Sequence, residues 1–118
     1  MATYTLNIAL KDGIWKVLDQ QGEPASPPEV TAGDTITWTC DDADVDFQFP
    51  EDDLFSGQSG YTSQLSSGGQ MSKTVASGSG KKTDQTIVYA AYCTPSDPAQ
   101  GGYAEGGSPP RMIIKGSG

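Results

Sequence analysis

The sequence of 118 residues predicts an all-β fold, a Greek-key β-sandwich of seven or eight strands. Short segments alternate apolar and polar residues, which is the period of strands with one buried face. Fifteen glycines and eight prolines supply turn positions between these segments. No segment has the apolar spacing of an amphipathic helix, and no internal repeat is found. The length suits a single domain over residues 1–118, in which 116–118 are interpreted as either a tail or an added sequence.

The N-terminal half contains the clearest strand patterns. Apolar and polar residues alternate from Thr3 to Leu10, and Ile14–Leu18 follows the turn signal at Lys11-Asp12-Gly13, so these two strands are expected to form a hairpin. Residues 19–28 contain three prolines and are expected to be a loop. The run Thr35–Cys40 alternates again and is rich in β-branched and aromatic residues, which favours a strand.

The C-terminal half is less uniform. A strand is expected around residues 45–49, and another near Gln70–Ala76 inside the Gly- and Ser-rich segment 56–83, which is otherwise expected to be loop. Thr83–Cys93 has the strongest strand pattern of the chain, and Met112–Ile114 is the expected last strand after a loop over 94–110. The aromatic residues expected in the core are Trp15, Trp38, Phe47, Phe49 and Tyr89.

The net charge of −8 limits the classes of partner. Nucleic acid is not expected, because phosphate binding needs a basic surface. A membrane surface is not expected for the same reason, and no apolar run is long enough to span a bilayer. The first residues, Met1 to Tyr4, lack a basic and apolar leader pattern. The chain as written is therefore expected to be cytoplasmic, or periplasmic or secreted if a leader was removed.

Two segments carry a resemblance to a known family. Glu29–Cys40 (EVTAGDTITWTC) resembles the strand-turn-strand of cupredoxins that precedes their first copper histidine. Tyr89–Gly102 (YAAYCTPSDPAQGG) resembles the cupredoxin ligand loop, which contains a cysteine, a histidine and then a methionine. Residues 113–115 look like the short closing strand, and the ending Tyr103–Ile114 is similar to small bacterial proteins of this shape. The resemblance implies a cupredoxin-like sandwich.

The copper ligands of that family are not matched. Type 1 copper needs two histidines, a cysteine thiolate and usually a methionine, and this chain has no histidine. By the resemblance, Asp46 and Ser96 stand where the histidines would be, Met112 lies too far along the chain, and only Cys93 matches. The sequence therefore predicts a copper-free scaffold and no cofactor.

Cys40 and Cys93 end two expected strands that, in a cupredoxin-like sandwich, finish at the same end of the two sheets. Three interpretations are open: two buried free thiols, a structural disulfide, or a thiol/disulfide redox pair. A separate hypothesis concerns Asp42, Asp44 and Asp46, whose order is that of the start of a calcium loop. Phe47 stands where an EF-hand needs glycine, so a carboxylate site for Ca²⁺ or another divalent ion competes with a solvated acidic loop.

The lack of histidine removes the commonest general base and the usual nucleophile partners, so the chain is expected not to be an enzyme. The leading hypothesis is a non-catalytic binding or assembly module that contacts a protein partner or a second copy through loops 41–57 and 94–110. Tyr61 and Tyr103 are the expected binding residues of the Gly-rich loops. A metal-binding protein and a redox protein are the alternatives, and the sequence leaves open whether a small-molecule ligand is bound.

Overall fold

The computed structural model describes residues 2–23, 28–58, 60–76, 85–104 and 110–114. The expected tail at 116–118 lies outside these residues, as do Thr83 and Asp84 of the expected strand over 83–93. Within the described part the elements are β1 (Thr3–Lys11), β2 (Ile14–Leu18), β3 (Glu29–Val30), β4 (Thr35–Cys40), β5 (Ala43–Gln48), β6 (Thr62–Leu65), β7 (Gly69–Thr74), β8 (Gln85–Val88), β9 (Ala90–Pro95), the short 3-10 helix η2 (Pro98–Gln100), β10 (Gly102–Tyr103) and β11 (Arg111–Ile114).

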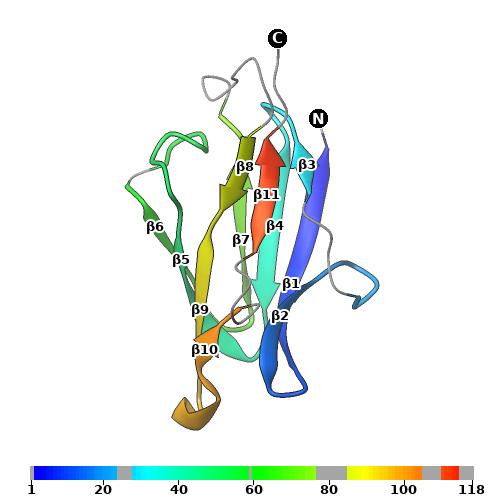
Figure 1. The fold of residues 1–118 in the computed structure, drawn as a ribbon, viewed down its shortest axis with the longest axis vertical. Coiled ribbons are helices and arrows are strands. Elements are labelled where there is room, and N and C mark those ends of the chain that lie inside the picture. The colour runs from blue at the N-terminus through cyan, green and yellow to red at the C-terminus, as the bar shows by residue number, and fades with distance from the viewer. Residues whose placement is uncertain (1, 24–27, 59, 77–84, 105–109, 115–118) are drawn as a thin grey trace.

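The strands form three sheets, which confirms the all-β prediction (Figure 1). One sheet has the order β2-β1-β4-β7, with β1 and β4 parallel. The second has the order β10-β9-β5-β6, and the third has the order β3-β11-β8. Residues 41 and 42 lead the chain from β4 in the first sheet to β5 in the second. These two sheets belong to the two layers of the sandwich, and the buried apolar side chains lie between the layers.

The hairpin expected at the N-terminus is present. Strands β1 and β2 pair antiparallel and their last pair is Lys11 with Ile14, which leaves Asp12 and Gly13 as a two-residue turn. Both turn residues have positive φ, 53° at Asp12 and 79° at Gly13, which is the geometry that favours an Asp-Gly sequence in tight hairpins. The predicted bounds of β2 and β4 agree with the structure.

The strand expected over 83–93 is divided in the structure. Its described part forms β8 and β9, which are separated at Tyr89 and belong to different sheets: β8 pairs with β11, whereas β9 pairs with β5 and β10. At the break the Tyr89 amide donates to the carbonyl of Pro110 over 3.1 Å. Alternation continues across the break, with Ile87, Tyr89, Ala91 and Cys93 all buried, so the sequence pattern gave no sign of the division.

Two segments expected to be loops contain strands. Strand β6 lies within the segment 56–83, next to the correctly expected β7, and β10 and η2 lie within the segment 94–110. Strand β6 has a single buried residue, Leu65, so its sequence carries no apolar pattern. The strand is stabilised instead by backbone pairing with β5. These short strands and the divided one bring the count in the described residues to eleven, above the seven or eight expected.

An aromatic cluster fills the space between the sheets. The ring of Trp38 lies 5.3 Å from that of Phe47 and 5.8 Å from that of Tyr89, measured between centroids. Phe49 and Phe55 complete the cluster, and the indole Nε1 of Trp38 donates to the Tyr89 hydroxyl over 3.1 Å. All five aromatic residues expected in the core are buried, and their contact area and the preferred tilted ring geometries stabilise the sandwich.

Asp34 is the one buried charged residue identified in the described part of the chain. Its carboxylate accepts hydrogen bonds from the backbone amides of Ala2, at 2.9 Å, and Thr31, at 3.0 Å. These bonds favour the ionised form and hold the pKa of Asp34 below its ordinary value. The side chain therefore joins the start of β1 to the turn that precedes β4.

Candidate functional site

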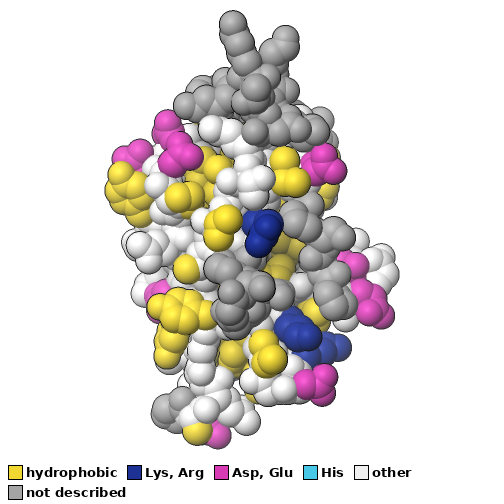
Figure 2. All heavy atoms as spheres, in the orientation of Figure 1, with side chains coloured by type: hydrophobic (Ala, Val, Ile, Leu, Met, Phe, Trp, Pro, Cys, Tyr) yellow, Lys and Arg dark blue, Asp and Glu magenta, His cyan; other side chains and the backbone are white. Residues whose placement is uncertain are grey.

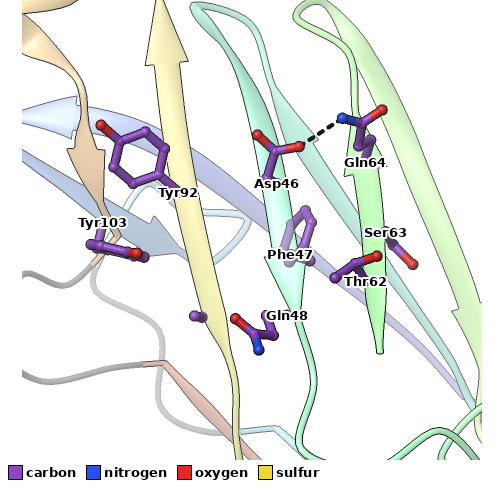
Figure 3. A pocket seen from close by; sticks show the side chains of 9 residues that line it. Asp46, Phe47, Gln48, Thr62, Ser63, Gln64, Tyr92 and Tyr103 are labelled. Carbon is purple, nitrogen blue, oxygen red and sulfur yellow. Dashed lines mark hydrogen bonds between the residues drawn. The ribbon is translucent and has the colours of Figure 1, made fainter. Parts of the chain in front are cut away.

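Four side chains from paired positions on neighbouring strands lie across the outer face of the β10-β9-β5-β6 sheet. Tyr103 is paired with Tyr92, Tyr92 with Asp46, and Asp46 with Gln64, each on the neighbouring strand. All four point outward, because the residues that alternate with them on β5 and β9 are buried. We call these residues the tyrosine row (Figure 3).

The two tyrosines of the row contact each other in an edge-to-face arrangement. Their ring centroids are 4.9 Å apart and the ring planes make an angle of 75°. The pair remains open to solvent, since Tyr103 is 58% exposed and Tyr92 is 40% exposed. Exposed aromatic side chains on a rigid sheet provide a large contact area at a small cost in conformational entropy, which is why tyrosine is enriched in binding surfaces.

A hollow of about 630 Å³ adjoins the row on the same face. Its lining includes Tyr92, Tyr103, Asp46, Gln48 and Ala90. Ala90 pairs with Gln48 on the adjacent strand, and its small side chain leaves the surface low where a larger residue would fill it. In Figure 3, Tyr92, Asp46 and Gln64 lie in the upper part of the view, and Tyr103, Thr62 and Gln48 lie below them. The hollow thus combines an aromatic wall with a carboxylate and an amide.

The two carboxylates of β5 are held in place by neighbouring donors. Gln64 Nε2 donates to Asp46 Oδ1 over 2.8 Å, and the backbone amide of Ser67 donates to Asp44 Oδ1 over 2.9 Å. Each bond uses one of the two carboxylate oxygens. A second hollow of about 210 Å³ lies beside Asp44, Asp46 and Thr94, so the Asp46–Gln64 pair separates two depressions on the same face.

The segment that carries Tyr103 is anchored to both layers. Trp15 Nε1, from β2 in the other layer, donates to the carbonyl of Gln100 over 2.7 Å. The amide of Ala104 donates to the carbonyl of Ala91 on β9 over 2.8 Å, and Ala104 is buried. These bonds flank Gly102–Tyr103 and fix the orientation of the Tyr103 ring relative to Tyr92.

The metal hypothesis gains no support from the geometry. Asp44 and Asp46 are exposed on β5 and bonded as described, and Asp42 is exposed in the turn before that strand. Among the residues that the structure describes, no three His, Cys, Asp or Glu side chains gather closely enough to hold a metal ion. The three aspartates therefore remain sequence-based candidates only.

Cys40 and Cys93 are both fully buried and both are free thiols in the structure. Cys40 ends β4 as expected, whereas β9 continues beyond Cys93 to Pro95. Burial raises the pKa of both thiols, and burial together with the neighbouring Cys40 raises the pKa of Cys93 to about 12. Reactive cysteines have lowered pKa values and partial exposure, so this geometry favours inert thiols over a redox pair.

The residues at the positions implied for copper do not surround a common point. Cys93 pairs with Val45 and points into the core, whereas Asp46 lies one residue further along β5 and points to the outer face. Ser96 is exposed beyond the end of β9, and Met112 is buried on β11 in a different sheet. Without histidine and with these directions, the donor set does not fit type 1 copper.

The binding residues expected from the sequence are separated by the fold. Tyr103 belongs to the row, but Tyr61 does not line the hollow, although it is 52% exposed. Residues 41 and 42 of the expected loop 41–57 lie at the end of the sheet where β9 finishes, because β5 starts opposite Pro95. The part of that loop after β5 leaves at the other end, opposite Ala90. Most of the two expected contact loops therefore does not form one surface, and the aromatic surface lies on strands instead.

Tyr92 was not identified from the sequence. The signal that could have found it is its position in the strand over 83–93, where a large aromatic residue falls on the face opposite to Ala91 and Cys93. The partner of Tyr92 across the strands, Asp46, was singled out only as a metal ligand. Their proximity follows from the register of β5 with β9, which becomes visible only in the structure.

Comparison with known proteins supports the fold. The structure resembles a multicopper oxidase from Campylobacter jejuni, described as a metallo-oxidase, with a TM-score of 0.52 and 17% identity over 98% of this chain and 26% of that chain. It also matches the McoA multicopper oxidase from Aquifex aeolicus, with a TM-score of 0.46 and 10% identity over 97% of this chain and 29% of that chain. The chain spans about a quarter of the length of the first of these proteins, 26%.

No protein-family model matches the chain, and no curated protein is significantly similar to it. The structural likeness to the Campylobacter jejuni oxidase shows the fold alone, at 17% identity. With the strand arrangement described above, it confirms a cupredoxin-like β-sandwich as the fold class.

The expectation that the chain is not an enzyme is corrected by this comparison. The Campylobacter jejuni protein that shares the fold is an oxidase, so a sandwich of this type does not exclude an enzyme. The missing histidines remove particular catalytic arrangements and do not by themselves define the class of protein.

None of the helices in the described ranges is long and apolar enough to cross a bilayer.

Proposed function

We propose that this chain is a binding domain on a cupredoxin-like scaffold, and that it recognises its partner through the tyrosine row and the adjoining hollow. One observation carries the proposal: Tyr92 and Tyr103 form an exposed edge-to-face pair in register with Asp46 and Gln64. The pair contributes apolar area, and the carboxylate and amide contribute directional hydrogen bonds. This is the combination that distinguishes a recognition surface from ordinary protein surface.

The rigidity of the row supports the same function. Its members lie on strands with buried inner faces, and the segment around Tyr103 is tied to β2 and β9 by the bonds of Trp15 and Ala104. A surface that is already ordered before binding loses little conformational entropy when the partner arrives. Neither the scaffold nor the core needs these tyrosines for packing, since both rings are substantially exposed.

Site-specific photo-crosslinking tests the proposal without knowledge of the partner. A benzophenone amino acid is introduced at position 103 or 92 of the protein in its producing cells, and at position 61 as the matched control, because Tyr61 is also an exposed tyrosine. We expect a discrete crosslinked species from positions 103 and 92 and none from position 61. An assembly of identical chains would give a species of twice the mass of 12.3 kDa. Equal crosslinking at all three positions, or none at 103 and 92, contradicts the proposal.

A further inference from the structure

The four strands of the sheet that holds the tyrosine row carry no basic side chain. None of the seven Lys and Arg residues lies within 17–72 or 83–110, so β5, β6, β9 and β10 and the turns beside them carry no basic side chain. Figure 2 agrees: on the face shown, the dark blue side chains lie over the β11 and β2 side and none lies over the β9 and β10 side. The sheet that holds the tyrosine row therefore carries the carboxylates of Asp44 and Asp46 and no basic side chain, and the nearest described cation along the same face is Arg111, which pairs with Val88 on β8.

The spacing of the two carboxylates matches an extended chain. Asp44 and Asp46 lie two residues apart on the outer face of β5, which separates them by about 6.8 Å along the strand. Each borders the smaller hollow, and Asp46 also borders the larger one with Tyr92. Side chains two residues apart in an extended peptide point the same way with the same spacing. Two such side chains could enter the two hollows on either side of the Asp46–Gln64 pair.

We propose that the partner of the tyrosine row is an extended basic peptide segment, in which two Arg or Lys side chains separated by one residue enter the two hollows. This inference rests on the proposed function and names the chemistry of its partner. One cation lies against the Tyr92 ring and Asp46, where a cation–π contact and a carboxylate act together. The other lies beside Asp44. The bonds from Gln64 and Ser67 hold the two carboxylates in position before binding.

Two other occupants fit the surface less well. A sugar ring needs a flat aromatic platform, whereas Tyr92 and Tyr103 meet at 75° and cover part of each other. A second copy of this chain carries the same net charge of −8, so its approach is opposed by repulsion between like charges. A basic segment is favoured by both the charge and the ring geometry.

Binding of short synthetic peptides tests the inference. The probe has two arginines separated by one serine in a Gly/Ser background, with both ends blocked. The first control has the same composition with the arginines adjacent, and the second has glutamate in place of arginine. Affinity is measured by calorimetry at low salt, and backbone amide shifts of Tyr92 and Tyr103 are followed by NMR. We expect the spaced peptide to bind best, with shifts centred on the row, and the glutamate peptide not to bind.

Protein variants assign the contacts. Asp46→Asn and Tyr92→Ala should each weaken binding of the spaced peptide by roughly threefold, a range set by exposed ion pairs and cation–π contacts. Tyr61→Ala should leave the affinity unchanged, because Tyr61 is exposed but does not line the hollow. Added salt should weaken binding to the wild type more than to Asp46→Asn.

The outcomes separate this inference from the proposed function. Equal affinity for the spaced and adjacent peptides, or no effect of Asp46→Asn, overturns the assignment of the two hollows. Binding of a neutral oligosaccharide at the row, with no binding of the basic peptide, would overturn the inference and leave the proposed function standing. Self-association of the chain that Tyr92→Ala abolishes would also overturn the basic-peptide inference and leave the proposed function standing. Crosslinking that shows no preference for positions 92 and 103 would contradict the proposed function itself.

Discussion

Trp38 and Tyr89 are joined by a buried hydrogen bond of 3.1 Å, in which the indole Nε1 donates to the tyrosine hydroxyl. The bond links β4 to the point where β8 ends and β9 begins, and the two rings also pack edge to face at 5.8 Å. It places a polar contact at the centre of an aromatic cluster that is otherwise held by ring packing.

Removal of the hydroxyl should therefore destabilise the fold. In Tyr89→Phe the indole N–H loses this buried acceptor, and we expect the free energy of unfolding to fall by about 1–3 kcal/mol. Urea denaturation followed by tryptophan fluorescence measures the change. Tyr92→Phe is the control, because that hydroxyl lies on an exposed side chain. Equal stability of the two variants would show that Trp38 finds another acceptor.

Asp34 should make stability depend on acidity. Its folded pKa is lowered mainly by the hydrogen bonds from the Ala2 and Thr31 amides, so its contribution to stability is present above the unfolded pKa of about 3.9. That contribution is lost as the pH falls through the lower folded pKa, when the carboxylate becomes protonated. In Asp34→Ala we expect a loss on the order of 2 kcal/mol at neutral pH and a smaller difference from wild type in acid.

Denaturation of both proteins at a series of pH values isolates the effect of Asp34, since the other carboxylates titrate in both. A difference between them that stays constant down to strong acid would rule out this role for Asp34.

The two buried cysteines should resist modification in the native protein. With the pKa of Cys93 raised to about 12 by burial and by Cys40, almost no thiolate exists at neutral pH. We expect a thiol reagent to label Cys40 and Cys93 only as fast as the protein unfolds, and both at once in denaturant. Mass measurement before labelling would reveal a disulfide by the loss of two hydrogens, and rapid native labelling would indicate an accessible thiol.

The raised pKa of Cys93 predicts that the protein loses stability at alkaline pH. The folded pKa of Cys93 is raised above the unfolded value of about 8.5, so its contribution to stability is full below that value. It is lost as the pH rises toward about 12, because the unfolded chain releases the proton first. Cys93→Ala, compared with wild type across alkaline pH, should show a flatter decline, and parallel declines would contradict this cause.

Replacement of the row tyrosines should leave the fold intact. Because Tyr92 and Tyr103 are 40% and 58% exposed, Tyr92→Ala and Tyr103→Ala should each lower the free energy of unfolding by about 1 kcal/mol at most, the loss expected for an exposed cross-strand aromatic pair. Thermal unfolding provides the measurement, with Phe47→Ala as the destabilised comparison, since that ring is buried in the core. A large loss from either tyrosine variant would mean that the pair serves stability rather than recognition.

Much of the fold could be predicted from local patterns. Strands β2 and β4 combine alternation with β-branched and aromatic residues, and their bounds were correct. Strand β6 was missed because its sequence, TSQL, has one apolar residue and depends on pairing with β5. The division at Tyr89 was missed because the buried face continues through it. Both depend on tertiary pairing, which a local period does not encode.

The candidate site shows the same limit. Tyr103 and Asp46 were each identified from the sequence, but for unrelated roles, and Tyr92 between them was overlooked. Their alignment requires the registers of β10 with β9 and of β9 with β5, and a shift of one residue in either would turn a member of the row inward.

The positions of the first and last strands have a practical consequence for attachment. Strand β1 starts, and β11 ends, at the end of the sandwich opposite to β10 (Figure 1). A tag or tether that follows on from either strand end starts at the end of the sandwich away from β10 and Tyr103. We therefore expect attachment to a sensor surface through either terminus to leave the tyrosine row accessible to solution.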